Sequence, residues 1–256
     1  MTTPRTWAPI GLAFVALAAC WAQAPPVRPE FELNDVHSKL NATLHAGILY
    51  PASVSDIQAA VRAAKASGQA ISISGGRHAM GGQQFGAGTL NLSMSGFKEV
   101  VAFDAERGIV EVQSGIQWPD LVAWLLAKQA GAKAQGGIRQ KQTGADRLSI
   151  GGALASNIHG RGLDMRPMID DVESFTLGDV AGDLQTCSRT EHPDLFRLVI
   201  GGYGLFGVIA NVRVRLAPVR ILERVVRVVD VDQFLPLVAA CTEISCSPST
   251  RSRTSS

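Results

Sequence analysis

The sequence predicts an α+β fold, in which helices and strands follow one another irregularly and form mixed sheets. Residues 53–68 repeat apolar side chains with a helical period and run directly into an alternating stretch at 71–74. Residues 98–115 and 172–188 each have the pattern of two strands joined by a tight turn, and residues 212–216 alternate strictly. Because helices and strands do not alternate one by one, a regular doubly wound sheet is the second choice.

The first helix is the best-defined element of the sequence. Ser53, with Asp56 three residues later, forms a capping-box pattern at its start, and Gly68 is expected to end it. The strand at 71–74 follows at once and leads into the glycine pair 75–76.

Short strands and a second helix are expected next. Pro119 lies in the first turn of an amphipathic pattern that Gly131 ends, which predicts a helix between them. The strands expected before this helix lie at 89–93, 98–104 and 108–115, with a hairpin turn at 105–108.

The second half of the chain continues with the same mixture of elements. Pro193 is expected to begin a short helix, and a new strand is expected at 221–231, after Pro218. The other elements predicted here are a helix start at 151–155, a hairpin that turns around 178–182 and a strand within 207–219, where residues 212–216 alternate strictly.

Length and composition indicate a globular chain with a ligand. The 256 residues are 46% hydrophobic, which is enough for a packed core in one large domain or two small ones. The 24 Lys and Arg residues nearly balance the 22 Asp and Glu residues, so a nucleic-acid partner is not expected. Clustered glycines indicate where the backbone approaches a ligand closely, and the clusters lie at 75–88, 131–137, 151–152 and 201–207.

The N-terminus has the pattern of an export signal. Arg5 precedes an apolar run at 10–19, and residues 22–24, Ala-Gln-Ala, resemble a cleavage site. We therefore expect residues 1–24 to be a signal peptide and the chain to be exported, either to the periplasm or out of the cell. The stretch that ends at Cys20 also resembles a lipobox, which would make this segment a lipoprotein leader with a lipid anchor on Cys20.

Several common site motifs are absent from the sequence. It contains no GxxxxGK[ST], GxSxG or HExxH pattern, which removes the commonest nucleotide hydrolase, serine hydrolase and zinc protease motifs. The four cysteines form no cluster with zinc spacing, so no metal is expected, and Cys187 is expected to be a small buried residue. Residues 202–207 match GxGxxG, but a strand pattern follows where a dinucleotide-binding turn needs a helix. A Rossmann NAD-binding protein is therefore disfavoured.

Two of the five histidines stand inside glycine-rich loops, and the other three do not. His37 and His45 have no glycine framework and are expected to be surface or core polar residues, while His192 is expected beside a helix cap. His78 and His159 each follow a regular element inside a glycine-rich loop, which makes them the candidate functional histidines.

The turn that carries His78 has the composition of a phosphate site. Its glycines expose consecutive backbone N–H groups, which bind a phosphate without any positive side chain. Arg77 would add charge, and a neutral His78 could act as a nucleophile toward a phosphorylated cofactor. A tight turn with a merely hydrogen-bonded histidine is the alternative that this stretch leaves open.

Three stretches together resemble the FAD-binding segments of the vanillyl-alcohol-oxidase/PCMH-type flavoproteins, which include aldonolactone oxidases, cytokinin dehydrogenases and alditol oxidases. In order, they are PASVSDIQAAVRAAKASGQAISISGGRHAMGGQ, DRLSIGGALASNIHGRG and DLFRLVIGGYGLFGVIANVRVRLAP. The resemblance implies a PCMH-type FAD-binding domain at 45–218, made of two α+β subdomains with FAD between them. It implies further that the C-terminal substrate domain is largely absent, with only its start at 219–245. Residues 25–44 are then a linker and residues 246–256 a disordered tail.

The resemblance also implies which residues contact FAD. The family's Gly-His-Ser form matches at His78, so this residue is expected to bond covalently to the flavin, while Ala79 replaces the serine. No cysteine for a second flavin bond stands between 145 and 162. His159 is the candidate catalytic residue that polarises the flavin or touches substrate, with a supporting hydrogen bond as the alternative role. The implied cofactor-binding residues are Ser74, Gly75, Gly76, Arg77, His78, Ala79, Gln83, Ser149, Gly151, Gly152, Ser156, Asn157, Gly160, Val208 and Ile209.

The function that the resemblance implies is that of an FAD-dependent oxidoreductase. FAD would accept a hydride from an alcohol or lactone-type CH–OH group of a small-molecule substrate and pass the electrons to O₂ or another acceptor, while the protein supplies orientation and excludes water. An oxidase and a dehydrogenase that excludes O₂ are both left open. A non-catalytic flavin-binding fragment is the alternative from another class, because a flavin without a substrate domain lacks a substrate pocket.

Overall fold

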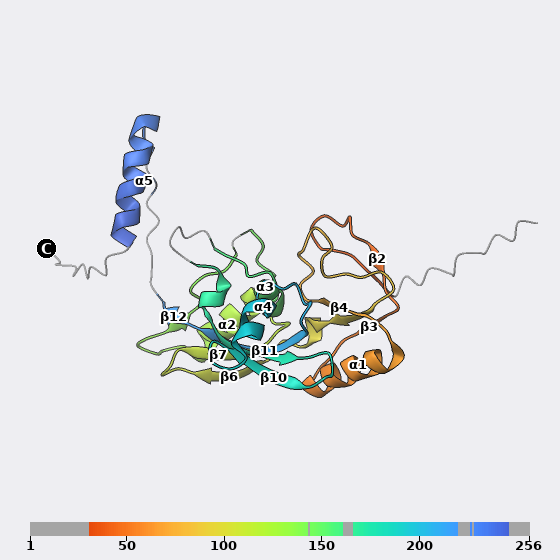
Figure 1. The fold of residues 1–256 in the computed structure, drawn as a ribbon. Coiled ribbons are helices and arrows are strands. Elements are labelled where there is room, and N and C mark those ends of the chain that lie inside the picture. The colour runs from red at the N-terminus through yellow and green to blue at the C-terminus, as the bar shows by residue number, and fades with distance from the viewer. Residues whose placement is uncertain (1–30, 143, 161–165, 220–225, 227, 246–256) are drawn as a thin grey trace, which may run out of the picture.

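The body of the protein consists of two sheets, one parallel and one antiparallel (Figure 1). The structure is a computed structural model that describes residues 31–142, 144–160, 166–219, 226 and 228–245. The predicted α+β class is confirmed, with the two kinds of strand pairing kept in separate sheets. The predicted leader, Cys20 and the predicted tail lie outside the described residues.

The parallel sheet has the strand order β3-β5-β4. Its strands are β3 (Gly47–Leu49), β5 (Leu90–Ser93) and β4 (Ile71–Ser74). The helix α1 (Val54–Ser67) connects β3 to β4, which is the crossover that two parallel strands require. Its residues Ile57 and Val61 are buried in one core cluster with Leu92 of β5 and with Phe97, which follows the short 3₁₀ helix η2 (Met94–Gly96).

Local sequence sets both ends of α1. The Asp56 amide donates to Ser53 Oγ at 3.2 Å, and the Ser53 amide donates to Asp56 Oδ2 at 2.9 Å. This is the predicted capping box. Gly68 adopts a left-handed φ of 68°, and its N–H bonds the last carbonyls of the helix, as the sequence predicts for a glycine at this end.

The antiparallel sheet has the order β10-β9-β11-β7-β6 and contains both predicted hairpins. Its strands are β6 (Val100–Asp104), β7 (Ile109–Gln113), β9 (Val172–Gly178), β10 (Leu184–Ser188) and β11 (Val208–Arg215). β11 is the central strand and pairs with β7 on one side and β9 on the other. Because a strand starts at Val208 directly after the GxGxxG stretch, the Rossmann interpretation is excluded, as the sequence predicts.

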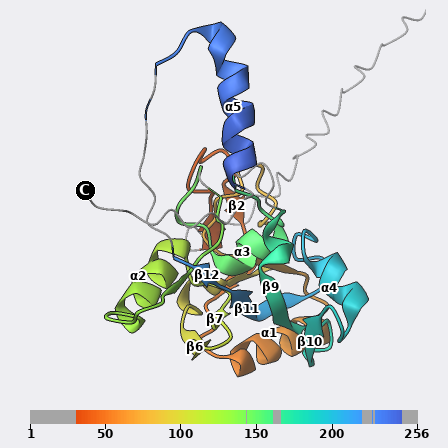
Figure 2. The ribbon, with the colours of Figure 1, turned by 90° about the vertical axis from the view of Figure 1, so that its left-hand side faces the viewer.

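Three helices pack on the inner face of the antiparallel sheet. They are α2 (Trp118–Lys128), α3 (Ile150–Ala155) and α4 (Pro193–Val199), and Figure 2 shows α2 and α4 on either side of α3. Together they form the larger core, with Val212 and Val214 of β11 in it. The pairing of β11 with β9 shifts register between Ile209 and Val212, and the residues Val208 and Ala210 belong instead to the core beneath α1. β11 therefore contributes side chains to both core clusters.

The remaining elements are small sheets, a 3₁₀ helix and a last helix. β1 (Glu32–Leu33) pairs with β2 (Thr43–Leu44), β8 (Gly136–Gly137) pairs with β12 (Ala217–Pro218), and η3 (Met168–Asp170) precedes β9. Part of the expected linker, residues 31–44, is therefore ordered. The strand expected at 221–231 lies mostly outside the described residues, and its described residues form no strand. Instead the helix α5 (Val231–Ser245) begins at Val231 and stands apart from the sheets (Figure 1).

No helix in the part of the chain that the structure describes is both long and apolar enough to cross a membrane.

Candidate functional site

A cavity of about 470 Å³ opens between the turn that follows the parallel sheet and the helix α3 that packs on the antiparallel sheet. This volume is within the range of small-molecule and cofactor sites. Its walls are the turn after β4, the first turn of α3 and the glycine turn in front of β11. The glycines of these walls that line it are Gly75, Gly76, Gly151, Gly152, Gly204 and Gly207.

Ser149 joins two of the cavity walls. It is the N-cap of α3, and its Oγ accepts from the Gly152 amide at 3.4 Å. The same oxygen accepts from the Gly76 amide at 3.3 Å. Two glycine segments that are 73 residues apart therefore meet at one buried hydroxyl group.

The glycines permit close packing of these segments. A Cβ on Gly75 would overlap the Ser149 hydroxyl, and a Cβ on Gly76 would lie 2.5 Å from the Arg147 carbonyl oxygen. A Cβ on Gly151 would lie 2.6 Å from Ser114 Cβ. Real Cβ atoms do not approach other atoms so closely, so any side chain here would push the cavity walls apart.

His78 lies in the cavity wall, half-buried, with its Nδ1 2.9 Å from Nε2 of His37. Burial lowers the pKa of His78 and the neighbouring charge of His37 lowers it further, while the Arg147 carbonyl acts in the opposite direction. His78 is therefore neutral at neutral pH, and a neutral imidazole is the nucleophilic form. Arg77, directly before it, adopts a left-handed φ of 56° and also lines the cavity.

The loop 35–41, between β1 and β2, carries His37. Asp35 is buried at its start, and its carboxylate organises the loop. Burial raises the pKa of Asp35, but its hydrogen bonds outweigh that effect and hold the pKa well below its usual range. The groups that donate to this carboxylate are the amides of His37, Ser38 and Lys39 and the side chains of Ser38 and Asn41.

Two hydrogen bonds fasten the loop 35–41 to the turn of His78. The Val36 amide donates to the Arg77 carbonyl at 2.9 Å, and Asn41 Nδ2 donates to the Met80 carbonyl at 2.7 Å. The two accepting residues, Arg77 and Met80, lie on either side of His78 in the sequence, so the loop 35–41 is attached to the turn on both sides of this histidine. Sequence reasoning set His37 aside because its segment has no glycine framework, and no pattern within that segment indicates the contact.

Two buried polar atoms on the cavity have no hydrogen-bond partner among the described residues. They are Ser114 Oγ and Gln84 Oε1. An unsatisfied buried polar atom costs about 1–3 kcal/mol, so this pair indicates a polar ligand. Sequence reasoning missed both residues. Ser114 directly follows β7 and precedes Gly115, and a strand followed by a glycine is the same pattern that indicated the turn after β4, so this signal could have found Ser114.

Most of the predicted cofactor-binding residues meet in this cavity. They come from three segments that are distant in the sequence. The predicted residues that line it are Gly75, Gly76, Arg77, His78, Ala79, Gln83, Ser149, Gly151, Gly152, Ser156 and Ile209.

Two predicted residues face the core instead of the cavity. Ser74 is buried, and its hydroxyl donates to Asn91 Oδ1 at 2.7 Å. Val208 is buried in the cluster beneath α1, because its side chain points to the opposite face of β11 from that of Ile209.

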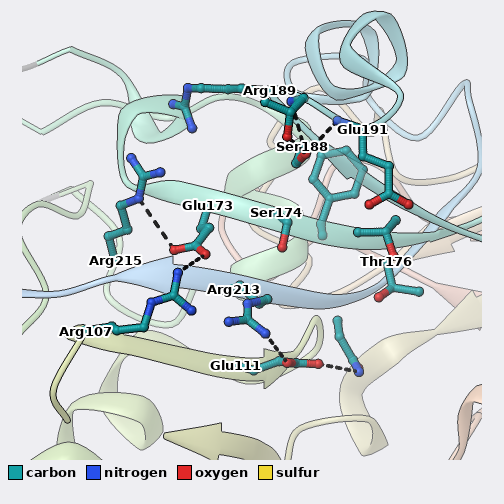
Figure 3. Close-up of a pocket in the computed structure, with 14 residues that line it drawn as sticks. Arg107, Glu111, Glu173, Ser174, Thr176, Ser188, Arg189, Glu191, Arg213 and Arg215 are labelled. Carbon is teal, nitrogen blue, oxygen red and sulfur yellow. Dashed lines mark hydrogen bonds and ion pairs between the residues drawn. The ribbon is translucent and has the colours of Figure 1, made fainter. Parts of the chain in front are cut away.

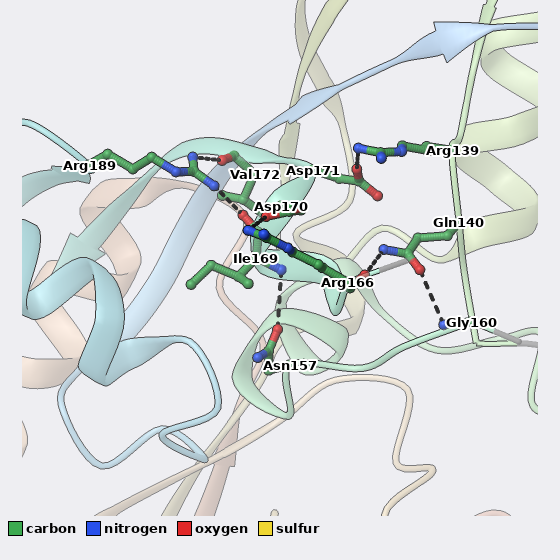
Figure 4. A network of polar contacts seen from close by, with 10 residues as sticks. All are labelled: Arg139, Gln140, Asn157, Gly160, Arg166, Ile169, Asp170, Asp171, Val172 and Arg189. Carbon is green, nitrogen blue, oxygen red and sulfur yellow. Dashed lines mark hydrogen bonds and ion pairs between the residues drawn. The ribbon is translucent and has the colours of Figure 1, made fainter. Parts of the chain in front are cut away.

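The remaining three, Asn157, His159 and Gly160, follow α3 in one loop. Figure 4 shows the hydrogen bonds that Asn157 and Gly160 make there with residues outside the cavity wall. Asn157, at a left-handed φ of 45°, accepts from the Ile169 amide at 3.1 Å, and the Gly160 amide donates to Gln140 Oε1 at 3.4 Å. His159 is exposed, with its Nδ1 2.8 Å from the Gly160 carbonyl oxygen. It is not among the residues that line the cavity, and its catalytic role stays a prediction.

A second hollow, of about 660 Å³, lies on the outer face of the antiparallel sheet (Figure 3). Glu173 pairs with Arg107 at 2.9 Å and with Arg215 at 3.7 Å, and Glu111 pairs with Arg213 at 3.5 Å. Because these charges already satisfy one another, the hollow offers a phosphate no free cluster of cations. We therefore take the smaller, glycine-lined cavity as the candidate site.

A family model described as an FAD binding domain matches residues 45–188, which is more than half of the chain. The chain belongs to the PCMH-type FAD-binding family. The resemblance stated from the sequence is thus confirmed, and the matched range includes both the turn of His78 and α3.

Curated relatives of this FAD-binding chain are named as oxidoreductases. An uncharacterized oxidoreductase in the fasciation locus of Rhodococcoides fascians is 32% identical over 66% of this chain and 37% of its own length. Cytokinin dehydrogenase 5 of Oryza sativa subsp. japonica is 31% identical over 70% of this chain and 35% of its own. A putative D-arabinono-1,4-lactone oxidase of Neurospora crassa is 26% identical over 66% of this chain and 29% of its own. The chain spans about a third of the length of these relatives.

The residues of the cavity fit FAD. The glycine turn after β4 and the Ser149 corner suit a pyrophosphate, which needs close backbone approach. Ile73, Leu148 and Ile158 add apolar lining that suits a flat ring system. The unpartnered Ser114 and Gln84 atoms leave polar groups for the ligand to satisfy. FAD is therefore the cofactor that this family and this cavity share.

Proposed function

We propose that this chain is the FAD-binding part of an oxidoreductase that removes a hydride from an alcohol or lactone-type CH–OH group of a small molecule. The observation that carries the proposal is the cavity in which two glycine segments meet at Ser149 beside a neutral His78. The names of the relatives support it, since they include cytokinin dehydrogenases and a putative lactone oxidase.

FAD, when bound, supplies the hydride and electron transfer. The chain's own residues hold and shield it. Backbone groups of Gly75 and Gly76 would approach the pyrophosphate, with the charge of Arg77 next to them. The apolar residues Leu148 and Ile158 would exclude water from the ring.

We propose further that His78 bonds covalently to the flavin. Its position in the cavity wall and its lowered pKa support this, because they keep a nitrogen lone pair available beside the cofactor. Ala79 follows it in place of the family's serine, so the hydrogen bonds to phosphate must come from backbone groups and from Ser149.

The electrons would then pass to O₂ or to another acceptor. Relatives of both kinds support keeping the two options, since one is named a cytokinin dehydrogenase and another a putative lactone oxidase. A flavin-binding chain without turnover is the second candidate, and the observation that favours it is that the chain spans about a third of the length of its relatives.

The test is to mix the purified, flavin-free full chain with FAD and to record its visible spectrum before and after acid precipitation. We expect a bound yellow chromophore that stays with the precipitate in the wild-type chain and is released from His78→Ala. His192→Asn is the matched control, because His192 is exposed at a left-handed position that Asn tolerates and should retain the flavin. A folded wild-type chain that binds no FAD would overturn the proposal.

Turnover is assayed on the same flavin-loaded chain with small alcohols and aldonolactones, using O₂ and an artificial acceptor in parallel. Reduction of the bound flavin by one of these substrates supports the oxidoreductase. Stable binding without reduction by any of them supports the second candidate.

A further inference from the structure

Met80 differs from the other methionines that the structure describes, because its side chain is open to solvent. It is 64% exposed, whereas Met94 and Met168 are 3% and 2% exposed and belong to the two core clusters. Met80 also lines the glycine-lined cavity that is the candidate FAD site. A thioether therefore lies at the mouth of this cavity, where dissolved reagents can reach it.

The backbone around Met80 is held by hydrogen bonds. The Met80 carbonyl accepts from Asn41 Nδ2 at 2.7 Å, and the Gly82 amide donates to the Ala79 carbonyl at 3.2 Å. Gln84 Nε2 donates to the same Ala79 carbonyl at 3.2 Å. Because these contacts fix the turn without using the thioether, we expect a chemical change in that side chain to act on the cavity mouth rather than on the fold.

The proposed reaction supplies an oxidant for this thioether. When O₂ accepts the electrons, two electrons and two protons convert it to hydrogen peroxide, which leaves through the cavity mouth. Peroxide then transfers one oxygen atom to the Met80 sulfur. A sulfur–oxygen bond forms, the O–O bond breaks and water is released, so the sulfur loses the two electrons that the peroxide gains and the step balances.

We propose that Met80 is a modification site at which hydrogen peroxide forms methionine sulfoxide and thereby weakens the uptake of FAD. The inference rests on the FAD binding and the electron transfer to O₂ proposed above. Oxidation makes this apolar side chain polar, and the new oxygen accepts hydrogen bonds without donating any. Such a group repels a phosphate oxygen, and its desolvation against an apolar ring is costly, so either part of FAD is disfavoured beside it.

The consequence is a feedback between loaded and flavin-free chains. Peroxide released over many turnovers of loaded chains would limit the loading of further chains. Methionine sulfoxide reductases convert the sulfoxide back to methionine, so this loss of affinity is reversible.

The test treats the flavin-free full chain with hydrogen peroxide and then titrates it with FAD. Fragmentation of its peptides in a mass spectrometer assigns each added oxygen atom to a single methionine. We expect the oxygen on Met80 well before Met94 or Met168, because those two are buried. The affinity for FAD, measured before any covalent bond forms, should fall several-fold and should return after treatment with methionine sulfoxide reductases.

Two substitutions of Met80 are the matched variants. Leucine keeps an apolar side chain of similar size without the sulfur, so peroxide should leave the FAD affinity of Met80→Leu at its own untreated value. Met80→Gln puts a polar side chain of similar length at the mouth and should bind FAD about as weakly as the oxidised wild type. The cysteines are the same in all these chains, so a loss caused by their oxidation would also appear in Met80→Leu. Thermal melts check that each chain is folded.

A second arm tests the flavin as the source of the peroxide. The FAD-loaded chain is reduced with one equivalent of dithionite under nitrogen and reopened to air over repeated cycles, with and without catalase. The flavin-free chain passes through the same cycles as a control. We expect Met80 sulfoxide in the loaded chain without catalase, and little of it in the other samples.

The outcomes separate this inference from the proposed function. Oxidation of Met94 as fast as Met80, or a Met80 sulfoxide that leaves the FAD affinity unchanged, overturns the inference while FAD binding stands. Cycles of the loaded chain that yield no Met80 sulfoxide overturn it as well. A folded wild-type chain that binds no FAD overturns the proposed function and the inference together.

Discussion

Ser149 Oγ and the Gly76 amide lie 3.3 Å apart, and this contact joins two walls of the cavity, the first turn of α3 and the turn after β4. The hydroxyl has two tasks, since it also caps α3 by accepting from Gly152. One buried side chain thereby couples the stability of a helix to the position of the turn that carries His78.

Comparison of Ser149→Ala with Ser53→Ala, which removes a helix cap away from the cavity, should separate the capping role of Ser149 from its role in the cavity. Ser149→Ala removes the α3 cap and the Gly76 acceptor, and should lower the free energy of unfolding by about 1 kcal/mol and weaken FAD binding several-fold. Ser53→Ala removes the N-cap of α1, which is far from the cavity lining, and should cause a similar loss of stability with unchanged FAD affinity. Chemical denaturation and FAD titration measure the two effects. Equal FAD affinity in both variants would contradict the role of Ser149 in the cavity.

A methyl group on Gly75 should disturb the same corner. In Gly75→Ala the new Cβ overlaps the Ser149 hydroxyl, so the serine must move and the free energy of unfolding should fall by about 1–3 kcal/mol, with weaker FAD binding. Gly96→Ala is the control, since its Cβ would meet nothing closer than the Pro51 carbonyl oxygen at 3.7 Å. Thermal melts with and without FAD compare the two variants, and a Gly75→Ala chain as stable as Gly96→Ala would show that the corner tolerates a side chain.

The Asp35 carboxylate should make the loop 35–41 sensitive to acid. Its pKa in the folded chain lies below the usual value of 3.8, so the stabilisation is complete above pH 3.8 and is lost as the pH falls below it. Asp35→Asn should therefore be less stable than wild type at neutral pH and should lose less stability between neutral and acid pH. Denaturation midpoints across this range test it, with Glu106→Gln in an exposed turn as control. Parallel pH curves for wild type and Asp35→Asn would contradict the expectation.

The thiol of Cys187 should be unreactive while the chain is folded. Burial raises the pKa of this thiol to about 11, with a further rise from the charge of Glu191, so the reactive thiolate is scarce at neutral pH. An alkylating reagent followed by peptide mass analysis should leave the Cys187 peptide unmodified in buffer and modify it fully in denaturant. Equal modification in both conditions would show that this strand opens readily.

Elements with local signals were predicted closely. The ends of α1 depend on Ser53, Asp56 and Gly68, whose hydrogen bonds reach only three or four residues along the chain. The hairpin β9–β10 and the strand β11 likewise follow from turn residues and alternation. The helix α5 was missed, because Pro236 interrupts its pattern and the preceding apolar residues resemble a strand.

The candidate site was predicted only in part. Glycine patterns and the family resemblance indicated the three segments, and most of the residues named for them line one cavity. His159 was assigned to the site by its glycine neighbours, and it lies exposed in the loop after α3, so its role stays a prediction. His37 was set aside for lack of such neighbours, although it touches His78. A glycine pattern reports that backbone bends or packs closely, not which side chain faces a ligand.

The sequence by itself determined the α+β class, most helix and strand boundaries, the FAD-binding family and the glycine segments that form the cavity. These depend on hydrogen bonds and periodicities between residues close in the chain, or on motifs in a recognisable order. Only the tertiary structure decided that Ser149 meets Gly76 across 73 residues and that His37 meets His78 across 41. Such contacts arise from the packing of separate elements around a shared core, and no local pattern encodes the partner of a side chain in advance.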